Sequence, residues 1–168
     1  MIAETKELEI CWMRPEWLPQ ALDVYQWYVS NSTATFQISP ATLKEMEQLL
    51  FFEDGRYRSF AAFSGGRFAG YGILTRYKAR EAFNLTAEVT VYLDASYCGK
   101  GIGRKMVDII EAHARDQGFH ALIAQICGEN TSSCALFERS GYLQCSRYRE
   151  VGYKFDRWLD LVCYQKIL

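Results

Sequence analysis

Several features are missing from this sequence of 168 residues, and each absence excludes a class of protein. No apolar run approaches the roughly 20 residues of a membrane-spanning helix, and the charged N-terminus lacks the apolar core of a signal peptide. Nor is there an excess of Lys and Arg: the formal net charge is −1, whereas proteins that bind nucleic acid or anionic membranes concentrate basic residues. We therefore expect a cytoplasmic protein that binds neither nucleic acid nor membranes.

Candidate metal ligands are also scarce. Only His113 and His120 could join cysteines in a metal site, and no two cysteines have the Cys-x-x-Cys spacing of zinc proteins. We therefore expect no metal, and cysteines that are reduced and act as small buried hydrophobic residues. Cys98 is the exception, because it precedes a glycine-rich turn whose amides would stabilise its thiolate. The six cysteines are Cys11, Cys98, Cys127, Cys134, Cys145 and Cys163.

What the sequence does contain is an alternation of strand-like and helix-like segments, typical of one mixed α/β (α+β) domain over residues 1–168. Ser64-Gly65-Gly66 joins two strand-like runs and predicts an antiparallel hairpin. We expect a mostly antiparallel central sheet flanked by helices. The expected strands are 8–13, 59–63, 67–74, 88–93, 121–126, 143–148, 152–155 and 158–165. The expected helices begin at Pro15, at Ser39-Pro40 as N-cap and first residue, at Ile102 and at Ser132.

Residues 88–104 join a strand to a helix through a glycine-rich turn. Gly99, Gly101 and Gly103 occupy every second position, so the backbone can adopt positive φ and approach a ligand closely. The free amides at the start of the helix, its dipole and the neighbouring basic side chains form a site for phosphate or pyrophosphate. The spacing fits neither a P-loop nor a dinucleotide fingerprint, and a tight turn without a ligand is the alternative.

This turn, Tyr97-Cys-Gly-Lys-Gly-Ile-Gly103, resembles the acetyl-CoA pyrophosphate loop of the GNAT family of N-acetyltransferases, whose pattern is Gln/Arg-x-x-Gly-x-Gly/Ala. Tyr97 replaces the usual Gln or Arg, which matters little because backbone amides make most of that contact. One branch, the phosphinothricin and methionine sulfone/sulfoximine acetyltransferases, is similar to the chain from about Ile10 to Lys166. The similar segments are 31–36, 77–80, 86–92, Asn130 and 152–160.

The resemblance implies the GNAT fold, in which two neighbouring strands, here 88–93 and 121–126, splay apart so that the pantetheine arm of acetyl-CoA inserts between them. Backbone amides of Val91 and Leu93 would then donate to the oxyanion. Asn130 would hold the pantetheine or orient the next helix, although an Asn after a strand is also a common N-cap. The residues expected to contact acetyl-CoA are Val91, Tyr92, Leu93, Gly99, Lys100, Gly101, Ile102, Gly103, Arg104, Asn130 and Ser133.

N-acetylation requires a neutral amine, because an ammonium has no lone pair, so a carboxylate within reach assists the reaction at neutral pH. Glu88 is the candidate base. It lies at the start of the strand that precedes the glycine-rich turn, where partial burial would raise its pKa, and it matches the catalytic Glu of the resembled branch. A salt bridge or a cap at the strand end is the alternative role.

A second expected residue is missing. Many relatives carry, seven residues after the Asn equivalent to Asn130, a Tyr that protonates the leaving thiolate, and the phosphinothricin branch often has His there; this chain has Phe137. Either the thiolate leaves unassisted, or a water or another hydroxyl such as that of Tyr92 substitutes. Direct transfer is favoured over a cysteine intermediate, because no cysteine has an activating base beside it in sequence.

Two loops are candidates for the acceptor site. In the resembled branch, residues 31–37 form part of the acceptor pocket. Residues 77–83 are too charged for a buried strand. They are either a solvated loop or a loop over the pocket, whose basic residues pair with an acceptor carboxylate or phosphinate while aromatic rings cover its aliphatic chain. The residues expected to contact the acceptor are Thr35, Phe36, Tyr77, Lys78, Arg80 and Phe83.

These features predict an acetyl-CoA-dependent N-acetyltransferase for a small amino-acid-like amine of the phosphinothricin or methionine sulfoximine type. The same chemistry on a protein N-terminus, polyamine or drug is one alternative, and a non-catalytic acyl-CoA-binding module is another. We also expect a homodimer, because the acceptor pocket of the resembled branch lies near a two-fold interface and Trp158 and other aromatic residues suit a buried contact.

Overall fold

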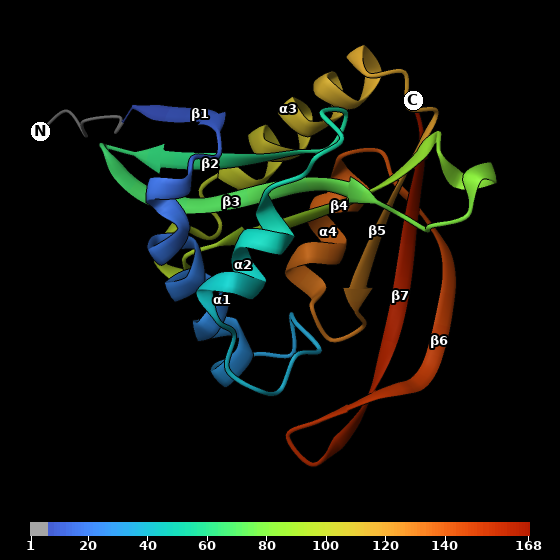
Figure 1. The fold of residues 1–168 in the computed structure, drawn as a ribbon. Helices are drawn as coiled ribbons and strands as arrows, with labels where there is room; N and C mark the ends of the chain where they lie inside the picture. The colour runs from blue at the N-terminus through green and yellow to red at the C-terminus, as the bar shows by residue number, and fades with distance from the viewer. Residues whose placement is uncertain (1–6) are drawn as a thin grey trace, which may run out of the picture.

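A computed structural model describes residues 7–168, which contain one sheet with strand order β1-β2-β3-β4-β5-β7-β6 (Figure 1). Neighbouring strands are antiparallel, except for the parallel pair β4 and β5. The strands are β1 (Leu8–Trp12), β2 (Arg58–Ser64), β3 (Arg67–Arg76), β4 (Thr86–Leu93), β5 (Ala121–Cys127), β6 (Leu143–Lys154) and β7 (Arg157–Ile167). The α-helices are α1 (Leu18–Asn31), α2 (Leu43–Leu50), α3 (Ile102–Asp116) and α4 (Thr131–Arg139), and the 3-10 helices are η1 (Pro15–Trp17), η2 (Glu81–Phe83) and η3 (Ala95–Tyr97). The predicted mixed, mostly antiparallel α/β fold is confirmed.

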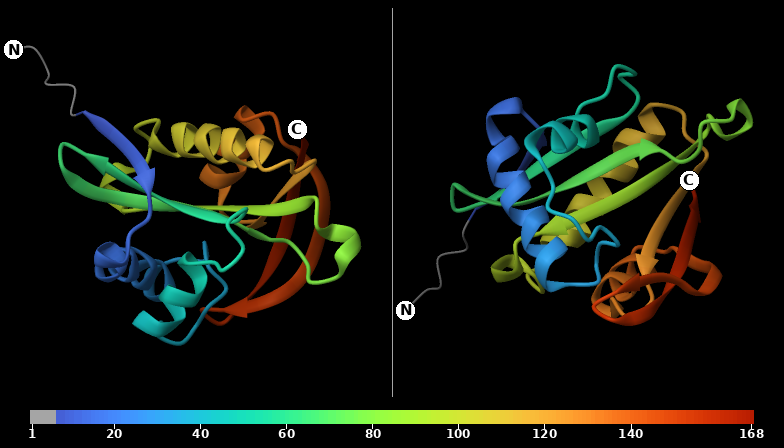
Figure 2. Two further views of the ribbon diagram at one scale, coloured as in Figure 1. Left: turned by 45° about the horizontal axis from the view of Figure 1, so that its top comes forward. Right: turned by 60° about the horizontal axis from the view of Figure 1, so that its bottom comes forward.

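Helices cover both faces of the sheet, with α3 on one side and α1 and α2 on the other (Figure 2, left). Met106 and Ile110 of α3 pack with Val89 of β4 and with Phe137 of α4 in one core. A second core joins α1 and α2 to the opposite face of β2 and β3. None of the helices within residues 7–168 has both the length and the apolar character that a membrane crossing requires.

Helix α2 begins later than the sequence predicted. Ser39-Pro40 precedes the helix without capping it, and Thr42 is the N-cap. The Thr42 hydroxyl accepts a hydrogen bond from Glu45 N–H (3.2 Å), and Glu45 Oε2 accepts one from Thr42 N–H (2.7 Å). This reciprocal capping box gives hydrogen-bond partners to two amides at the helix start. A proline at the first helical position merely lacks an N–H that would have no partner there.

The C-terminal hairpin of β6 and β7 is long and irregular. Residues 143–148 and 152–155 were predicted as separate strands, yet β6 runs from Leu143 to Lys154 with a register shift between Tyr148 and Gly152. Glu150 has a φ of 51° in this irregularity, and its N–H donates to Asp160 Oδ1 across 2.9 Å. The hairpin turns at two residues with positive φ, Phe155 and Asp156, which is the geometry of a type I′ turn.

Candidate active site

Strands β4 and β5 pair only over their first residues and then separate. Within residues 7–168 their parallel register ends at Glu88 and Ile123, although β4 continues to Leu93 and β5 to Cys127. The two ribbons diverge from this shared end (Figure 1). The splay that the resemblance implied is therefore present, and Glu88 lies where the gap opens.

Backbone groups of β4 face this gap. Asp94 N–H donates to the Ala69 carbonyl on β3 across 2.9 Å, and hydrogen bonding alternates along an antiparallel strand. The N–H and C=O groups of Val91 and Leu93 consequently point to the other edge, toward the gap. The Tyr28 hydroxyl from α1 donates to the Leu93 carbonyl there, across 2.6 Å. The Val91 and Leu93 N–H groups therefore point into the gap. This is the direction required of donors to a carbonyl oxygen that lies there.

Glu88 shares one face of β4 with Tyr92, since alternate residues of a strand point the same way. The Tyr92 ring packs against Tyr25 of α1, with 5.3 Å between centroids, so both side chains lie on the α1 side of the sheet. Gln125 Nε2 of β5 donates to Glu88 Oε2 across 3.1 Å. Burial raises the pKa of Glu88, and the hydrogen bond from Gln125 partly opposes that rise. A carboxyl group with a raised pKa in this position is suited to accept a proton.

The glycine-rich turn leads from η3 into α3. Gly99 and Gly101 have φ values of 74° and 80°, and a Cβ at either residue would meet no heavy atom within 4 Å. Their α-carbons therefore face open space at the N-terminus of α3, where the free amides and the positive end of the dipole attract an anion. Lys100 lies over the Tyr97 ring, with 5.3 Å from Nζ to the centroid. The open space fits the predicted role of the turn in binding pyrophosphate, which stays a prediction.

The other residues assigned to acetyl-CoA have structural partners. The Ile102 side chain is buried in the core, and a Cβ at Gly103 would lie 3.2 Å from Leu136 of α4. Arg104 pairs with Asp108 at 2.9 Å and also donates to the Arg139 carbonyl. These contacts show that Gly103 permits close packing of α3 on α4, while a contact of Arg104 with the cofactor stays a prediction.

The N-terminus of α4 lies beyond the end of β5. Asn130 is the N-cap of this helix, and its Oδ1 accepts a hydrogen bond from Ser133 N–H across 3.2 Å. Asn130 therefore has the alternative role expected from the sequence, that of a helix N-cap. Contacts of Asn130 and Ser133 with acetyl-CoA remain predictions.

Phe137 occupies the position at which the resemblance placed a proton donor. Its side chain is 2% exposed and packs edge-to-face on Tyr142 with 5.0 Å between ring centroids. The residue is therefore part of the core beneath α4. Tyr28, which the helical spacing assigns to an apolar stripe and not to the site, places a hydroxyl at the gap. Burial raises the pKa of this phenol so that it stays protonated.

The segment 31–37 connects α1 to the region before α2. Thr35 is 6% exposed, and its hydroxyl lies 3.0 Å from the Tyr25 hydroxyl and accepts from Gln37 N–H at 3.2 Å. Phe36 packs on the C-terminal hairpin, where a Cβ at Gly152 would lie 2.6 Å from the ring. Phe36 is nevertheless 37% exposed, while Thr35 is mainly internal to the segment, and contacts of either with an acceptor stay predictions.

The segment 77–83 forms a compact aromatic and basic cluster. The rings of Tyr77 and Phe83 meet edge-to-face at 5.9 Å, and Lys78 Nζ lies 5.1 Å from the first centroid and 5.4 Å from the second. Lys78 and Arg80 are exposed. The segment bends toward the side of the sheet that carries α1 and α2 (Figure 2, left). It thus lies on the same side as Glu88, although the hydrogen bonds and ion pairs within residues 7–168 do not join it to segment 31–37.

Lys154 and Glu129 contribute to this region without having been predicted. Lys154 Nζ donates to the carbonyls of Ser32 and Thr35, across 2.7 and 2.9 Å. Glu129 accepts from the Thr33 hydroxyl at 3.1 Å and forms a two-pronged ion pair with Arg157. A charged residue beside a hairpin turn ordinarily faces solvent, so nothing local in the sequence distinguishes Lys154.

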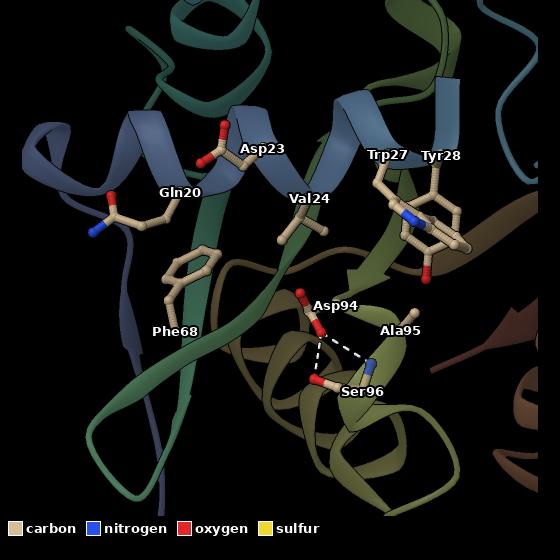
Figure 3. Close-up of a pocket in the computed structure, with 9 residues that line it drawn as sticks. All are labelled: Gln20, Asp23, Val24, Trp27, Tyr28, Phe68, Asp94, Ala95 and Ser96. Atoms are coloured by element: carbon tan, nitrogen blue, oxygen red, sulfur yellow. Dashed lines mark hydrogen bonds between the residues drawn. The ribbon is translucent and has the colours of Figure 1, made fainter. Parts of the chain in front are cut away.

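A separate hollow of about 500 Å³ lies between α1 and η3 (Figure 3). It contains neither Glu88 nor the glycines of the turn. Asp94, on its floor, is already occupied by hydrogen bonds from the backbone and side chain of Ser96. The hollow is lined by Gln20, Asp23, Val24, Trp27, Tyr28, Phe68, Asp94, Ala95 and Ser96. We therefore place the candidate active site at the β4–β5 gap.

Comparison with known proteins identifies the family of this chain. Residues 21–142 match the acetyltransferase (GNAT) family. The chain belongs to this family. The L-methionine sulfoximine/L-methionine sulfone acetyltransferase of Pseudomonas paraeruginosa is 32% identical over 153 residues, which cover 88% of this chain and 87% of that protein. The predicted family and enzyme class are thereby confirmed for this acetyltransferase.

Two solved structures share the fold of this GNAT chain. A phosphinothricin acetyltransferase from Sinorhizobium meliloti, in complex with acetyl-CoA, has a TM-score of 0.89 and 26% identity, with 96% of this chain and 88% of that chain covered. A ribosomal-protein-alanine N-acetyltransferase from Brucella melitensis has a TM-score of 0.88 and 31% identity, with 95% and 99% covered. The predicted cosubstrate, acetyl-CoA, is thus bound by a close structural neighbour.

Proposed function

We propose that this GNAT enzyme transfers the acetyl group of acetyl-CoA directly to the amino group of a small amino-acid-like acceptor, of the phosphinothricin or methionine sulfoximine type. The observation that carries the proposal is the position of Glu88, a carboxyl group with a raised pKa at the point where β4 and β5 separate. Family membership supplies the reaction class, and the names of the relatives suggest the acceptor class.

Acetyl-CoA supplies the acetyl thioester, and the residues of the chain supply the rest. Glu88 accepts a proton from the acceptor ammonium, which frees the nitrogen lone pair to form the C–N bond. The extra proton that the nitrogen carries after the attack leaves for the departing thiolate or for solvent. The Val91 and Leu93 amides donate to the thioester oxygen as negative charge develops on it. The C–S bond then breaks and coenzyme A leaves as a thiolate, whose low basicity relative to an amine allows departure without the hydroxyl that Phe137 lacks.

The glycine-rich turn and the start of α3 would hold the pyrophosphate of acetyl-CoA. Support comes from the open space at Gly99 and Gly101, where a side chain would occupy the region above the helix N-terminus. Lys100 is exposed next to these glycines and would add charge attraction. Arg104 would contribute only if its side chain leaves Asp108 and the Arg139 carbonyl, and Asn130 Oδ1 only if it leaves the Ser133 N–H. The Ser133 hydroxyl would add a further contact at the start of α4.

The acceptor would lie on the α1 side of Glu88, between segments 31–37 and 77–83. Lys78 and Arg80 are exposed and would bind a carboxylate or phosphinate, and the paired rings of Tyr77 and Phe83 would cover an aliphatic chain. Phe36 would form part of the opposite wall. These roles rest on the shared side of the sheet and on the similarity to amino-acid acetyltransferases.

We also propose a cytoplasmic homodimer. All six cysteines are free, as befits a reducing compartment. The edge strand β6 and its hairpin expose large apolar side chains, and an exposed apolar edge strand is a surface that natural proteins usually cover. These side chains are Leu143, Tyr148, Val151, Tyr153, Phe155 and Trp158.

A second acceptor class is favoured by one specific observation. The Brucella melitensis neighbour, named as a ribosomal-protein-alanine N-acetyltransferase, is 31% identical to this chain. A protein N-terminus presents the same α-amino group without the free carboxylate of an amino acid. The two acceptor classes are therefore separated by whether Lys78 and Arg80 contribute to acceptor binding.

The test is release of the coenzyme A thiol in the presence of phosphinothricin or methionine sulfone, followed by mass spectrometry of the product. The proposal expects thiol release that depends on the acceptor and a product heavier by one acetyl group on nitrogen. Thiol release that occurs only with a peptide would select the second acceptor class. Thiol release with neither would contradict both.

A further inference from the structure

Lys154 is a buried lysine that the transfer chemistry does not use. It lies at the end of β6, directly before the turn of the C-terminal hairpin, and is 3% exposed. Within residues 7–168, the hydrogen-bond acceptors of its ammonium are all backbone carbonyls: Ser32 at 2.7 Å, Thr35 at 2.9 Å and Tyr28 at 3.5 Å. An ammonium has three N–H donors, so this arrangement matches its full donor capacity.

The three carbonyls belong to one structural unit. Tyr28 lies in the last turn of α1, Ser32 is its C-cap, and Thr35 lies three residues further along the segment. The Tyr28 carbonyl also accepts the Ser32 N–H at 3.0 Å, and a cation at the C-terminal end of a helix interacts favourably with the dipole. Burying a charge is costly unless it is fully hydrogen-bonded, and the Lys154 contacts meet this condition.

The buried Lys154 side chain therefore links the end of α1 and the segment after it to the C-terminal hairpin. Phe155 covers the ammonium, with 5.0 Å between Nζ and the ring centroid. Phe155 itself has a φ of 51°, which is unfavourable for a bulky residue and persists only where the surroundings hold it. Gly152, two residues before Lys154, has no side chain and leaves room for the Phe36 ring.

A second, weaker link joins the same two parts. Arg157 follows the turn and binds Glu129, which in turn accepts the Thr33 hydroxyl. The side chains of Arg157 and Glu129 are 50% and 43% exposed, and exposed ion pairs contribute little because water and salt screen them. Lys154 and Arg157 thus flank one turn and hold the same segment. Lys154 is the more buried of the two, so we expect it to contribute more.

We propose that Lys154 is a positioning residue that fixes the conformation of residues 32–36 and thereby sets the affinity for the acceptor. This inference rests on the proposed function, because only that function places the acceptor against Phe36. Lys154 acts through the segment and contacts no reacting atom. Because residues 32–36 are already ordered, acceptor binding does not carry the entropic cost of ordering them. The gain is therefore in binding rather than in the chemical step.

The experiment compares Lys154→Met with Arg157→Gln, its matched control on the same turn, by steady-state kinetics and by amide hydrogen exchange. For Lys154→Met we expect faster exchange in residues 32–37, an acceptor KM raised about tenfold or more, a smaller change in kcat and an unchanged Kd for acetyl-CoA. For Arg157→Gln we expect changes within about twofold. Should the methionine variant not fold, Lys154→Gln keeps part of the hydrogen bonding and should show the same pattern at smaller amplitude.

Unchanged exchange in residues 32–37 and an unchanged acceptor KM would overturn the positioning role. Faster exchange with an unchanged acceptor KM would also overturn it, because the segment would then be held by Lys154 without forming the acceptor site. Hydrogen exchange needs no acceptor, so it distinguishes a failure of the Lys154 contact from a failure of the proposed function.

Discussion

Gln125 Nε2 donates to Glu88 Oε2 across 3.1 Å, and this hydrogen bond spans β4 and β5 at the point where the two strands separate. Burial raises the pKa of Glu88, while Gln125 stabilises the ionised carboxylate and lowers the pKa. Gln125 also fixes one carboxylate oxygen, and the proposed function assigns the other to the acceptor amine. The pH dependence of the enzyme should consequently report on this pair.

Replacing Gln125 by Leu should move the acid limb of the kcat/KM profile to higher pH. Glu88 acts as a base only when ionised, and loss of the hydrogen bond raises its pKa further, so activity is lost first at low pH. At a pH well above both pKa values the variant and the wild type should converge. An acid limb that stays in place would show that the Gln125 contact has no influence on the titrating group.

Glu88→Gln should retain acetyl-CoA affinity but lower kcat by about 10²- to 10⁴-fold near neutral pH, the usual contribution of a general base. The deficit should shrink as pH approaches the pKa of the acceptor amine, because the fraction of neutral amine then rises without help from the enzyme. Rate measurements from neutral pH up to roughly pH 10, around the pKa of an amine, test this. A deficit that is constant with pH would make Glu88 structural.

Gly101→Ala should abolish tight acetyl-CoA binding, and Gly118→Ala is its matched control at the other end of α3. The two glycines have φ values of 80° and 77°, and a Cβ at either would meet nothing within 4 Å. Both variants should lose roughly 1–2 kcal/mol of stability from the left-handed conformation. Calorimetry should show weakened binding only for Gly101→Ala, since only its Cβ enters the anion site; equal affinities would remove the pyrophosphate assignment.

Lys78→Met and Arg80→Met should each raise KM for an anionic acceptor. A hydrogen bond to a charged group contributes about 1.5–3 kcal/mol, which corresponds to roughly ten- to hundredfold in kcat/KM. Arg67→Gln, an exposed basic residue at the start of β3, serves as control and should behave as wild type. Loss of activity toward an acceptor without a carboxylate in the same variants would argue for a structural role of the segment instead.

The fold could be predicted largely from local patterns. Alternation in residues 88–93 and helical spacing after Ile102 identified β4 and α3, and positive φ at Gly99 and Gly101 followed from their spacing. The start of α2 was missed even though Thr42 and Glu45 have the spacing of a capping box. That signal was available and competes directly with Ser-Pro as a helix start.

The candidate site was only partly predictable, because several of its contacts join residues far apart in the chain. Lys154 meets Ser32 across 122 positions, and Gln125 meets Glu88 across 37. Such pairs depend on the sheet order and on the register, which periodicity does not determine. Likewise, the charge of Lys78 and Arg80 predicted exposure, whereas the side of the sheet to which they turn depends on the course of η2.

The most direct test of the proposed function is a competition in one reaction. Phosphinothricin, methionine sulfone, spermidine and a short peptide with a free N-terminal alanine are supplied at equal concentrations with limiting acetyl-CoA, and the acetylated products are quantified by mass spectrometry. Product ratios give the ratios of kcat/KM directly. The amino-acid analogues should dominate, and that preference should fall in Lys78→Met. Dominance of acetylated spermidine or acetylated peptide would contradict the assignment of the acceptor.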